Sequence, residues 1–192
     1  MFLSSSLWTD YTSCLNRDKC HQHGIYMAFS LMHCYIHFNM IRITIQENDF
    51  SLEQEINRLR KDRVDIGAIA SFTGLVRDLN EGDEVSLLTL EHYPGMTENQ
   101  LYEIASEAES RWPLQAITII HRVGTLAPGD QIVLVITASP HRAAAYESNE
   151  FIMDYLKTRA TFWKKEELES RSRWVKSRHS DDDAADRWKK PA

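Results

Sequence analysis

The sequence predicts an α+β fold with a mostly antiparallel sheet. Segments with a two-residue hydrophobic period and segments with helical periodicity follow in the order β-α-β-β-α-β-β-α, with further extended chain after them. This order lacks the regular βαβ alternation of a doubly wound parallel sheet. The 7 glycines also stand singly, so the sequence contains no glycine-rich phosphate loop.

The first strand and helix are predicted directly after residue 39. The stretch "IRITIQ", residues 41–46, alternates apolar and polar side chains as a half-buried strand does. The helix begins in "SLEQEINRLRKD", where Ser51 is the expected N-cap and Gln54 occupies the capping-box position. The buried stripe of this helix is expected to contain Leu52, Ile56 and Leu59.

A hairpin and a second helix are expected next. "IGAIASFTG" (66–74) and "VSLLTLEHY" (85–93) favour strands, and the polar loop between them, with Gly82, predicts that they pair. The second helix takes Thr97 as its N-cap and ends before Pro113. Its apolar residues at helical spacing are Leu101, Ile104, Ala105 and Ala108.

The last part of the domain is expected to contain two paired strands, a third helix and a final strand. "AITIIHRVG" (116–124) and "DQIVLVITA" (130–138) flank the turn "TLAPGD" and are expected to be neighbours. Ser139 and Pro140 predict the start of the third helix. Because "TRATFWK" favours extended chain, this helix should end near Ala160. Its buried stripe should contain Ala144, Phe151, Ile152 and Tyr155.

Charge and hydropathy exclude several classes of protein. The formal net charge of -6 argues against a general nucleic-acid binder, which needs a surplus of Lys and Arg. The longest apolar stretch, residues 25–38, is shorter than the roughly 20 residues that span a bilayer, so no membrane helix is expected. The N-terminal sequence lacks the pattern of a secretory signal, and a cytoplasmic location is therefore expected.

Residues 1–39 differ in composition from the rest of the chain. They hold only 4 of the 50 charged residues. We therefore expect a main domain of residues 40–192, preceded by an N-terminal extension that is poorly ordered or reflects an upstream start. The cysteine count is odd and zinc-type spacing is missing, so neither a disulfide framework nor a metal site is expected. The extension contains Cys14, Cys20, Cys34, His21, His23, His33 and His37.

Several cations stand where an anion site would need them. Arg77 follows a predicted strand, and His141 and Arg142 lie in the first turn of the third helix, where free N–H groups favour an anion. If the chain turns back after this helix, Lys164 approaches Lys157. Each residue also has a plain structural explanation, since exposed arginines are usually solvated and the aromatic pair between the lysines is typical of a core. These residues alone predict a local anion site.

Longer motifs resemble one known family. The large, catalytic subunit of molybdopterin synthase is similar in "ASFTGLVRD", "LTLEHYPGMTE", "RWPL", "IHRVGTLAPGD", "ASPHRAAAYES" and "FIMDYLKTRATFWKKE", in the same order. The resemblance covers about residues 64–188 and leaves out residues 1–39. It implies an α/β hammerhead-type fold, which agrees with the α+β prediction.

The resemblance implies a sulfurtransferase of molybdenum cofactor biosynthesis. In the family, two sulfurs are delivered to cyclic pyranopterin monophosphate (precursor Z) to form the dithiolene of molybdopterin, and neither a cofactor nor a metal is expected. Lys157 matches the catalytic lysine and Lys164 the second active-site lysine. Leu75 and Thr161 depart from the pattern, because some relatives have lysine and proline there. The implied substrate-binding positions are Leu75, Val76, Arg77, His141, Arg142, Met153, Lys165 and Glu166.

The resemblance also implies protein partners. A small ubiquitin-like subunit carries the sulfur as a C-terminal Gly-Gly thiocarboxylate, and its tail enters a pocket on the large subunit. Two large subunits form the homodimer core of a heterotetramer, in which the partner's His-Arg pair can complete a pocket. Two other functions remain open. One is a non-catalytic module that binds such a tail, and the other is a polyanion binder that uses residues 157–178, where Lys and Arg outnumber Glu.

Overall fold

The structure is a computed structural model of the chain. It describes residues 40–80, 82–168, 171–175 and 179–189. The chain divides into two units, residues 1–36 and 37–192, and every described residue belongs to the second. All expectations for residues 1–39, including their cysteines and histidines, lie outside the described residues, and the domain boundary at Met40 stays a prediction.

A four-stranded sheet forms the centre of the described domain, with the strand order β1-β5-β7-β2. β1 and β5 are parallel, whereas β5–β7 and β7–β2 are antiparallel pairs. The predicted pairing of the strands on either side of "TLAPGD" is therefore confirmed. The four strands are β1 (Met40–Gln46), β2 (Ala68–Leu75), β5 (Ala116–Arg122) and β7 (Gln131–Ser139).

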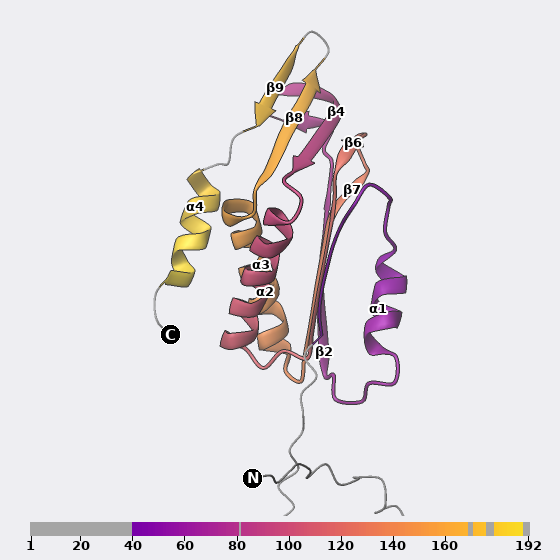
Figure 1. Cartoon of the computed structure of the whole chain (residues 1–192), viewed down its shortest axis with the longest axis vertical. Coiled ribbons are helices and arrows are strands. Elements are labelled where there is room, and N and C mark those ends of the chain that lie inside the picture. The colour runs from indigo at the N-terminus through magenta and orange to yellow at the C-terminus, as the bar shows by residue number, and fades with distance from the viewer. Residues whose placement is uncertain (1–39, 81, 169–170, 176–178, 190–192) are drawn as a thin grey trace, which may run out of the picture. The chain divides into compact units, whose positions relative to one another are not determined.

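Helices cover both faces of this sheet (Figure 1). Ile117 and Ile119 of β5 belong to one buried cluster with Leu101 of α2 and Phe151 of α3. Ile120 of the same strand belongs to a second cluster that includes residues of α1. Because successive side chains of a strand point to opposite faces, a strand covered on both sides is apolar throughout. The three helices are α1 (Leu52–Arg60), α2 (Met96–Arg111) and α3 (Arg142–Arg159).

A second, antiparallel sheet lies beyond one end of the first (Figure 1). Its order is β3-β4-β8-β9, and β6 also pairs with β4. Among the described strands, β1–β5 is the one parallel pair, so the predicted α+β class with mostly antiparallel sheet is confirmed. The remaining elements are β3 (Leu79–Asn80), β4 (Asp83–His92), β6 (Gly124–Leu126), β8 (Phe162–Leu168), β9 (Ser172–Val175), α4 (His179–Asp186) and the 3-10 turn η1 (Arg187–Lys189).

The predicted hairpin between residues 66–74 and 85–93 is wrong. β2 pairs with β7 in the first sheet, whereas β4 pairs with β8 in the second. The polar loop forms a short hairpin of its own, in which Asn80 pairs with Asp83 and Gly82 has a φ of 89° that suits glycine. The loop therefore carries the chain from one sheet to the other.

Two predicted helix caps are also wrong. α2 is capped at Gly95, whose N–H donates to the Glu98 carboxylate at 2.6 Å, and Thr97 is buried in the first turn. α3 begins two residues later than expected, with His141 at the N-cap. The Ser139 hydroxyl instead accepts from the His141 N–H at 3.2 Å. Ser139 and Thr97 therefore contribute at these helix starts without being the N-cap residues, which a capping pattern in the sequence does not reveal.

Candidate active site

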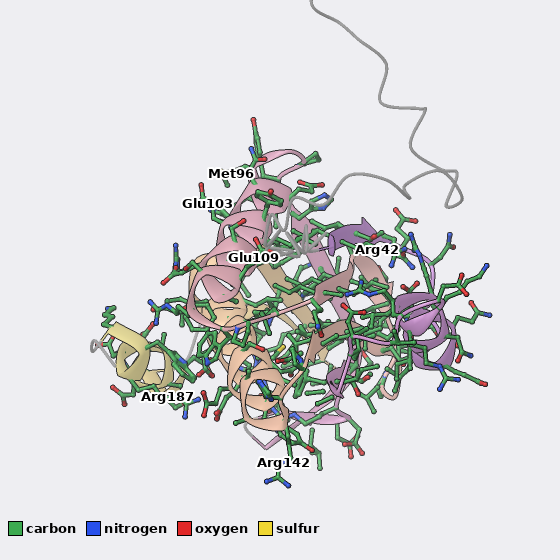
Figure 2. All side chains as sticks on the ribbon, turned by 90° about the horizontal axis from the view of Figure 1, so that it is seen from below. Arg42, Met96, Glu103, Glu109, Arg142 and Arg187 are labelled. Carbon is green, nitrogen blue, oxygen red and sulfur yellow. The ribbon has the colours of Figure 1, made fainter. Side chains whose placement is uncertain are left out.

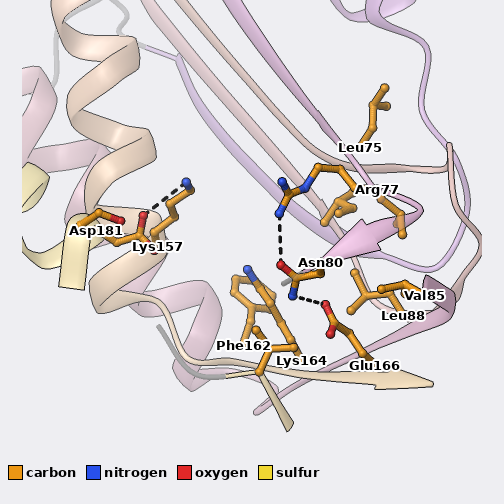
Figure 3. Close-up of a pocket in the computed structure, with 14 residues that line it drawn as sticks. Leu75, Arg77, Asn80, Val85, Leu88, Lys157, Phe162, Lys164, Glu166 and Asp181 are labelled. Atoms are coloured by element: carbon orange, nitrogen blue, oxygen red, sulfur yellow. Dashed lines mark hydrogen bonds and ion pairs between the residues drawn. The ribbon is translucent and has the colours of Figure 1, made fainter. Parts of the chain in front are cut away.

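A pocket of about 430 Å³ opens where the end of α3, the start of β8 and the chain after β2 meet (Figure 3). Its volume is in the range of small-molecule sites. Lys157 and Arg77 extend toward each other from opposite walls (Figure 3). Six of the ten predicted site residues line this pocket: Leu75, Val76, Arg77, Lys157, Lys164 and Glu166.

The turn between α3 and β8 brings the two lysines to the same pocket. α3 ends just before Ala160, whose backbone is extended with φ -83° and ψ 128°. β8 then starts at Phe162 and runs back beside β4. Helix end and strand start are both as predicted, and Lys164 lines the same cavity as Lys157.

Strand alternation decides which residues of β8 can reach a ligand. Phe162, Lys164 and Glu166 occupy alternate positions of the strand, so their side chains point to the same face, and all three line the pocket. Lys165 belongs to the opposite face of the strand, where its ammonium lies 2.8 Å from the Glu167 carboxylate. The structure therefore does not bring Lys165 into the pocket.

Helix α2 holds the turn between the lysines through two hydrogen bonds. The main-chain N–H of Thr161 donates to Oε1 of Gln100 at 2.9 Å. The Thr97 hydroxyl donates to the Thr161 carbonyl at 3.1 Å. A proline at position 161 has no N–H and could not make the first bond. The departure at Thr161 is therefore accompanied by a specific hydrogen bond that fixes the same turn.

Lys157 lies at the open side of the pocket. Its side chain is 48% exposed, and its ammonium is 3.5 Å from the carboxylate of Asp181 on α4. Asp181 and its neighbour Ser180 line the pocket as well. An exposed ion pair of this kind contributes only about 0 to 1 kcal/mol, so a bound anion can compete with Asp181 for the lysine.

Lys164 lies deeper and is a weaker base than an ordinary lysine. Burial lowers its pKa below 10.5, and the nearby charge of Lys157 lowers it further, whereas Asp181 acts in the opposite direction. Desolvation and a neighbouring like charge both disfavour the ammonium form. Lys164 is therefore suited to proton exchange closer to neutral pH than a solvated lysine.

Arg77 is oriented by a chain of hydrogen bonds that ends at Glu166 (Figure 3). The guanidinium of Arg77 donates to Oδ1 of Asn80 at 3.3 Å, and Nδ2 of Asn80 donates to Glu166 at 2.7 Å. The buried Glu166 carboxylate also accepts from Nε of Arg173 at 2.9 Å. Its charge is thus balanced inside the protein. Glu166 is thus linked to Arg77 through Asn80, and its own charge is met by Arg173.

His141 and Arg142 lie at the opposite end of α3 from Lys157. Both are exposed, and the Arg142 side chain extends away from the body of the domain (Figure 2). Lys157 is fifteen positions after Arg142 on the helix, which corresponds to roughly 22 Å along the axis. One chain therefore does not bring the His-Arg pair to its own lysine pocket.

Met153 lines a second pocket of about 380 Å³ on the other side of Lys157. This pocket lies between α3 and β2, and Phe72 and Tyr146 on its walls are exposed aromatic residues. β2 is an edge strand of the four-stranded sheet. Met153 thus adjoins the lysine without entering the first pocket.

The basic segment after residue 157 does not form a continuous cationic surface in the part of the chain that the structure describes. Five of the six Lys and Arg residues described between 157 and 175 lie in ion pairs with carboxylates. Their carboxylate partners offset part of the surplus positive charge that a polyanion binder presents to phosphates. The five paired residues are Lys157, Arg159, Lys165, Arg171 and Arg173.

Three residues at or beside the pocket were not predicted from the sequence. Asn80 lies in a polar loop and Asp181 is 24 residues after Lys157, so no local pattern points to either. His121 is different, because it is a single polar ring in the apolar run "AITIIHR". A buried polar residue in such a run is an informative exception.

The described ranges contain no group of three or more His, Cys, Asp or Glu side chains that could hold a metal ion. No helix among the described residues combines the length and apolar character needed to cross a bilayer.

Comparisons with known proteins agree on one family. The family model described as MoaE protein matches residues 45–159. A molybdopterin synthase catalytic subunit from Vibrio cholerae is 55% identical over 147 residues, which cover 77% of this chain and 97% of the relative. A solved MoaE protein from Burkholderia ambifaria is 51% identical with a TM-score of 0.68, covering 79% of this chain and all of that one. A solved molybdopterin synthase from Staphylococcus aureus is 34% identical with a TM-score of 0.63, and the match covers 69% of this chain and 96% of that one.

The cationic pocket has the size of a small-molecule site, and these matches identify the class of protein. The chain belongs to the MoaE protein family. It is an enzyme of molybdopterin biosynthesis with the hammerhead-type α+β fold of its solved relatives. The predicted family, fold and enzyme class are confirmed, whereas the roles of single residues stay predictions.

Proposed function

We propose that the pocket between α3 and β8 is where two sulfurs are transferred to cyclic pyranopterin monophosphate to form molybdopterin. Each sulfur comes from the thiocarboxylated C-terminus of one small ubiquitin-like subunit. The sulfur forms a bond to a carbon of the pterin, water then breaks the acyl–sulfur bond, and the donor leaves as a carboxylate, so two donors act in turn. The observation that carries this proposal is the convergence of Arg77, Lys157 and Lys164 in one cavity of a MoaE-family chain. We place the reaction in the cytoplasm.

The charges of the pocket suit these reactants. A phosphate ester and a thiocarboxylate are both anions and repel each other, so bringing them together requires fixed cations. Because Arg173 balances Glu166, the three cations of the pocket wall are opposed mainly by Asp181. Fixed cations also stabilise the negative charge that develops on the acyl oxygen during transfer.

The two lysines differ in the roles that their surroundings support. Lys157 is half exposed at the pocket opening and is proposed to contact the reacting groups directly and to exchange a proton with them. Lys164 is deeper and less basic, which supports a role in holding the substrate and exchanging a proton. Arg77 is proposed to bind the phosphate, because its orientation is fixed through Asn80.

His141 and Arg142 are proposed to act in the pocket of a second copy. They lie roughly 22 Å from Lys157 along α3, so a role beside the pterin phosphate requires another subunit. A two-fold homodimer supplies such a pair to each pocket, and one small subunit then binds each large subunit. The exposed Phe72 and Tyr146 beside the β2 edge are consistent with a surface that a subunit covers.

Complementation between two inactive variants tests this arrangement. Lys157→Ala and Arg142→Ala chains are co-expressed with different affinity tags, and dimers that carry both tags are purified. Each mixed dimer contains one pocket with both side chains intact, so it should recover about half of the wild-type rate if the pockets work independently. Activity no higher than that of the separate variants would place Arg142 outside the partner's pocket. The matched control is a dimer of one wild-type chain and one chain that carries both substitutions. It contains the same two substitutions but no pocket with both side chains intact, so it should stay inactive.

A further inference from the structure

His121 is a buried imidazole that the proposed reaction does not use. It lies on β5 and is 1% exposed, between the neighbouring strands β1 and β7. Its Nδ1 is 2.8 Å from the carbonyl oxygen of Arg122. Because a carbonyl only accepts, Nδ1 carries a proton. Burial lowers the pKa of His121 to about 3, so the ring is neutral at pH 7.

The His121 ring stacks on Phe162 at the base of the lysine pocket. The ring centroids are 3.7 Å apart and the planes differ by 12°. Phe162 is the first residue of β8, lines the pocket and precedes Lys164 by two positions. Since β5 belongs to the first sheet and β8 to the second, the stack joins the two sheets where the lysine-bearing strand begins.

Besides Arg77 and Glu166 of the pocket wall, four titratable side chains on four elements act on His121 or Lys164. Lys164 of β8 and His92 of β4 both lower the pKa of His121. Lys157 of α3 lowers the pKa of Lys164, and Asp181 of α4 raises it. A positive charge at position 121 would repel Lys164, whereas a neutral ring supports Phe162 without adding to the repulsion among the cations.

We propose that His121 is a positioning residue for Lys164: its neutral ring supports Phe162 and thereby fixes the start of β8, which sets the depth of Lys164 and its separation from Lys157. The importance of this position for turnover rests on the proposed function. The position of Lys164 itself does not, because it can be measured without substrate.

The pH dependence of Lys164 acetylation by acetic anhydride, followed by peptide mass spectrometry on the folded full-length chain, measures the basicity of Lys164. His121→Leu keeps a neutral apolar side chain of similar size but removes the flat ring. Loss of the stack should let Lys164 approach water and move away from Lys157, so its pKa should rise toward 10.5. His121→Phe keeps a ring on Phe162 and should restore most of the lowered value.

Turnover gives the second readout. With saturating substrate and donor, His121→Leu should lower kcat by roughly tenfold or more, since small misplacements of reacting groups are costly, while KM changes less. His121→Phe should recover a large part of this loss. Thr118→Val, a buried change on the same strand, should leave the pKa of Lys164 unaltered even if it lowers Tm.

Phe162→Leu removes the other half of the stack and covers the case in which His121→Leu does not fold. It should raise the pKa of Lys164 in the same direction. An unchanged Lys164 pKa in whichever of the two leucine variants folds would overturn the proposal. If the pKa shifts as expected but the wild-type chain forms no molybdopterin, the proposed function fails and the positioning role stands.

Discussion

Glu166→Gln tests whether the buried carboxylate orients Arg77. The Glu166 side chain is 8% exposed, and each carboxylate oxygen accepts one hydrogen bond, from Asn80 at 2.7 Å and from Arg173 at 2.9 Å. Glutamine has one acceptor oxygen and one NH₂ group. Whichever way the amide turns, one of the two donors then faces another donor.

The expected cost follows from these contacts. A lost hydrogen bond to a charged group costs about 1.5 to 3 kcal/mol. Arg173 keeps Asp83 and the Asn80 carbonyl, both at 3.0 Å, so about 2 kcal/mol is expected. For a domain of this size that corresponds to a Tm decrease of about 4 to 8 °C. Because Asn80 is less firmly held, pterin binding through Arg77 should weaken by up to roughly tenfold.

Thermal unfolding and substrate affinity are measured for Glu166→Gln beside a matched control. Glu167→Gln removes an ion pair to Lys165 on the opposite face of β8, where the Glu167 side chain is 37% exposed. Such a pair contributes about 0 to 1 kcal/mol, so Tm should fall by less than about 4 °C and pterin affinity should be unchanged. Equal effects of the two substitutions would refute the positioning role of Glu166.

Three further predictions follow from the described residues and the sequence. Lys164 has a lowered pKa in the folded protein, so between that pKa and 10.5 the unfolded chain binds more protons and stability rises with pH. Lys164→Met should therefore raise Tm at pH 7, by an amount that shrinks as the pH nears 10.5, and should lower turnover less than Lys157→Ala does; a gain in Tm that grows with pH would contradict this. Gln100→Ala leaves the Thr161 N–H without its partner, so it should lower the free energy of unfolding by about 1 kcal/mol and also lower kcat. Unchanged Tm and kcat would contradict this prediction. Deleting residues 1–39 should leave Tm and turnover nearly unchanged, since the charged and periodic sequence begins at Met40.

Elements whose signals are local could be predicted from the sequence. The N-cap of α1 is confirmed, because the Ser51 side chain accepts from the Gln54 N–H at 3.3 Å within one turn. The end of α3 near Ala160 and the strand after it are confirmed for the same reason. Strand pairing is not local, which explains why β2 was assigned to β4 when the more apolar β7 forms its partner.

The site shows the same division. Lys157, Lys164 and Arg77 all line the pocket as predicted, and the turn at Thr161 is what brings the two lysines together. The position of Lys165 on the other face follows from strand alternation, which the sequence contains but motif matching ignores. Asp181 reaches the pocket through the packing of α4 on α3, for which the sequence offers no pattern.

Single-turnover molybdopterin formation by Lys157 variants, with saturating thiocarboxylated small subunit and cyclic pyranopterin monophosphate, tests the central claim most directly. Lys157→Ala should nearly abolish product formation while the small subunit still binds, and Lys157→Arg should also fail, since arginine keeps the charge but cannot exchange a proton near pH 7. Arg159→Ala, two residues away and paired with Glu107, is the matched control and should keep the wild-type rate. A near-normal rate in Lys157→Ala would contradict the assignment of the chemistry to this lysine.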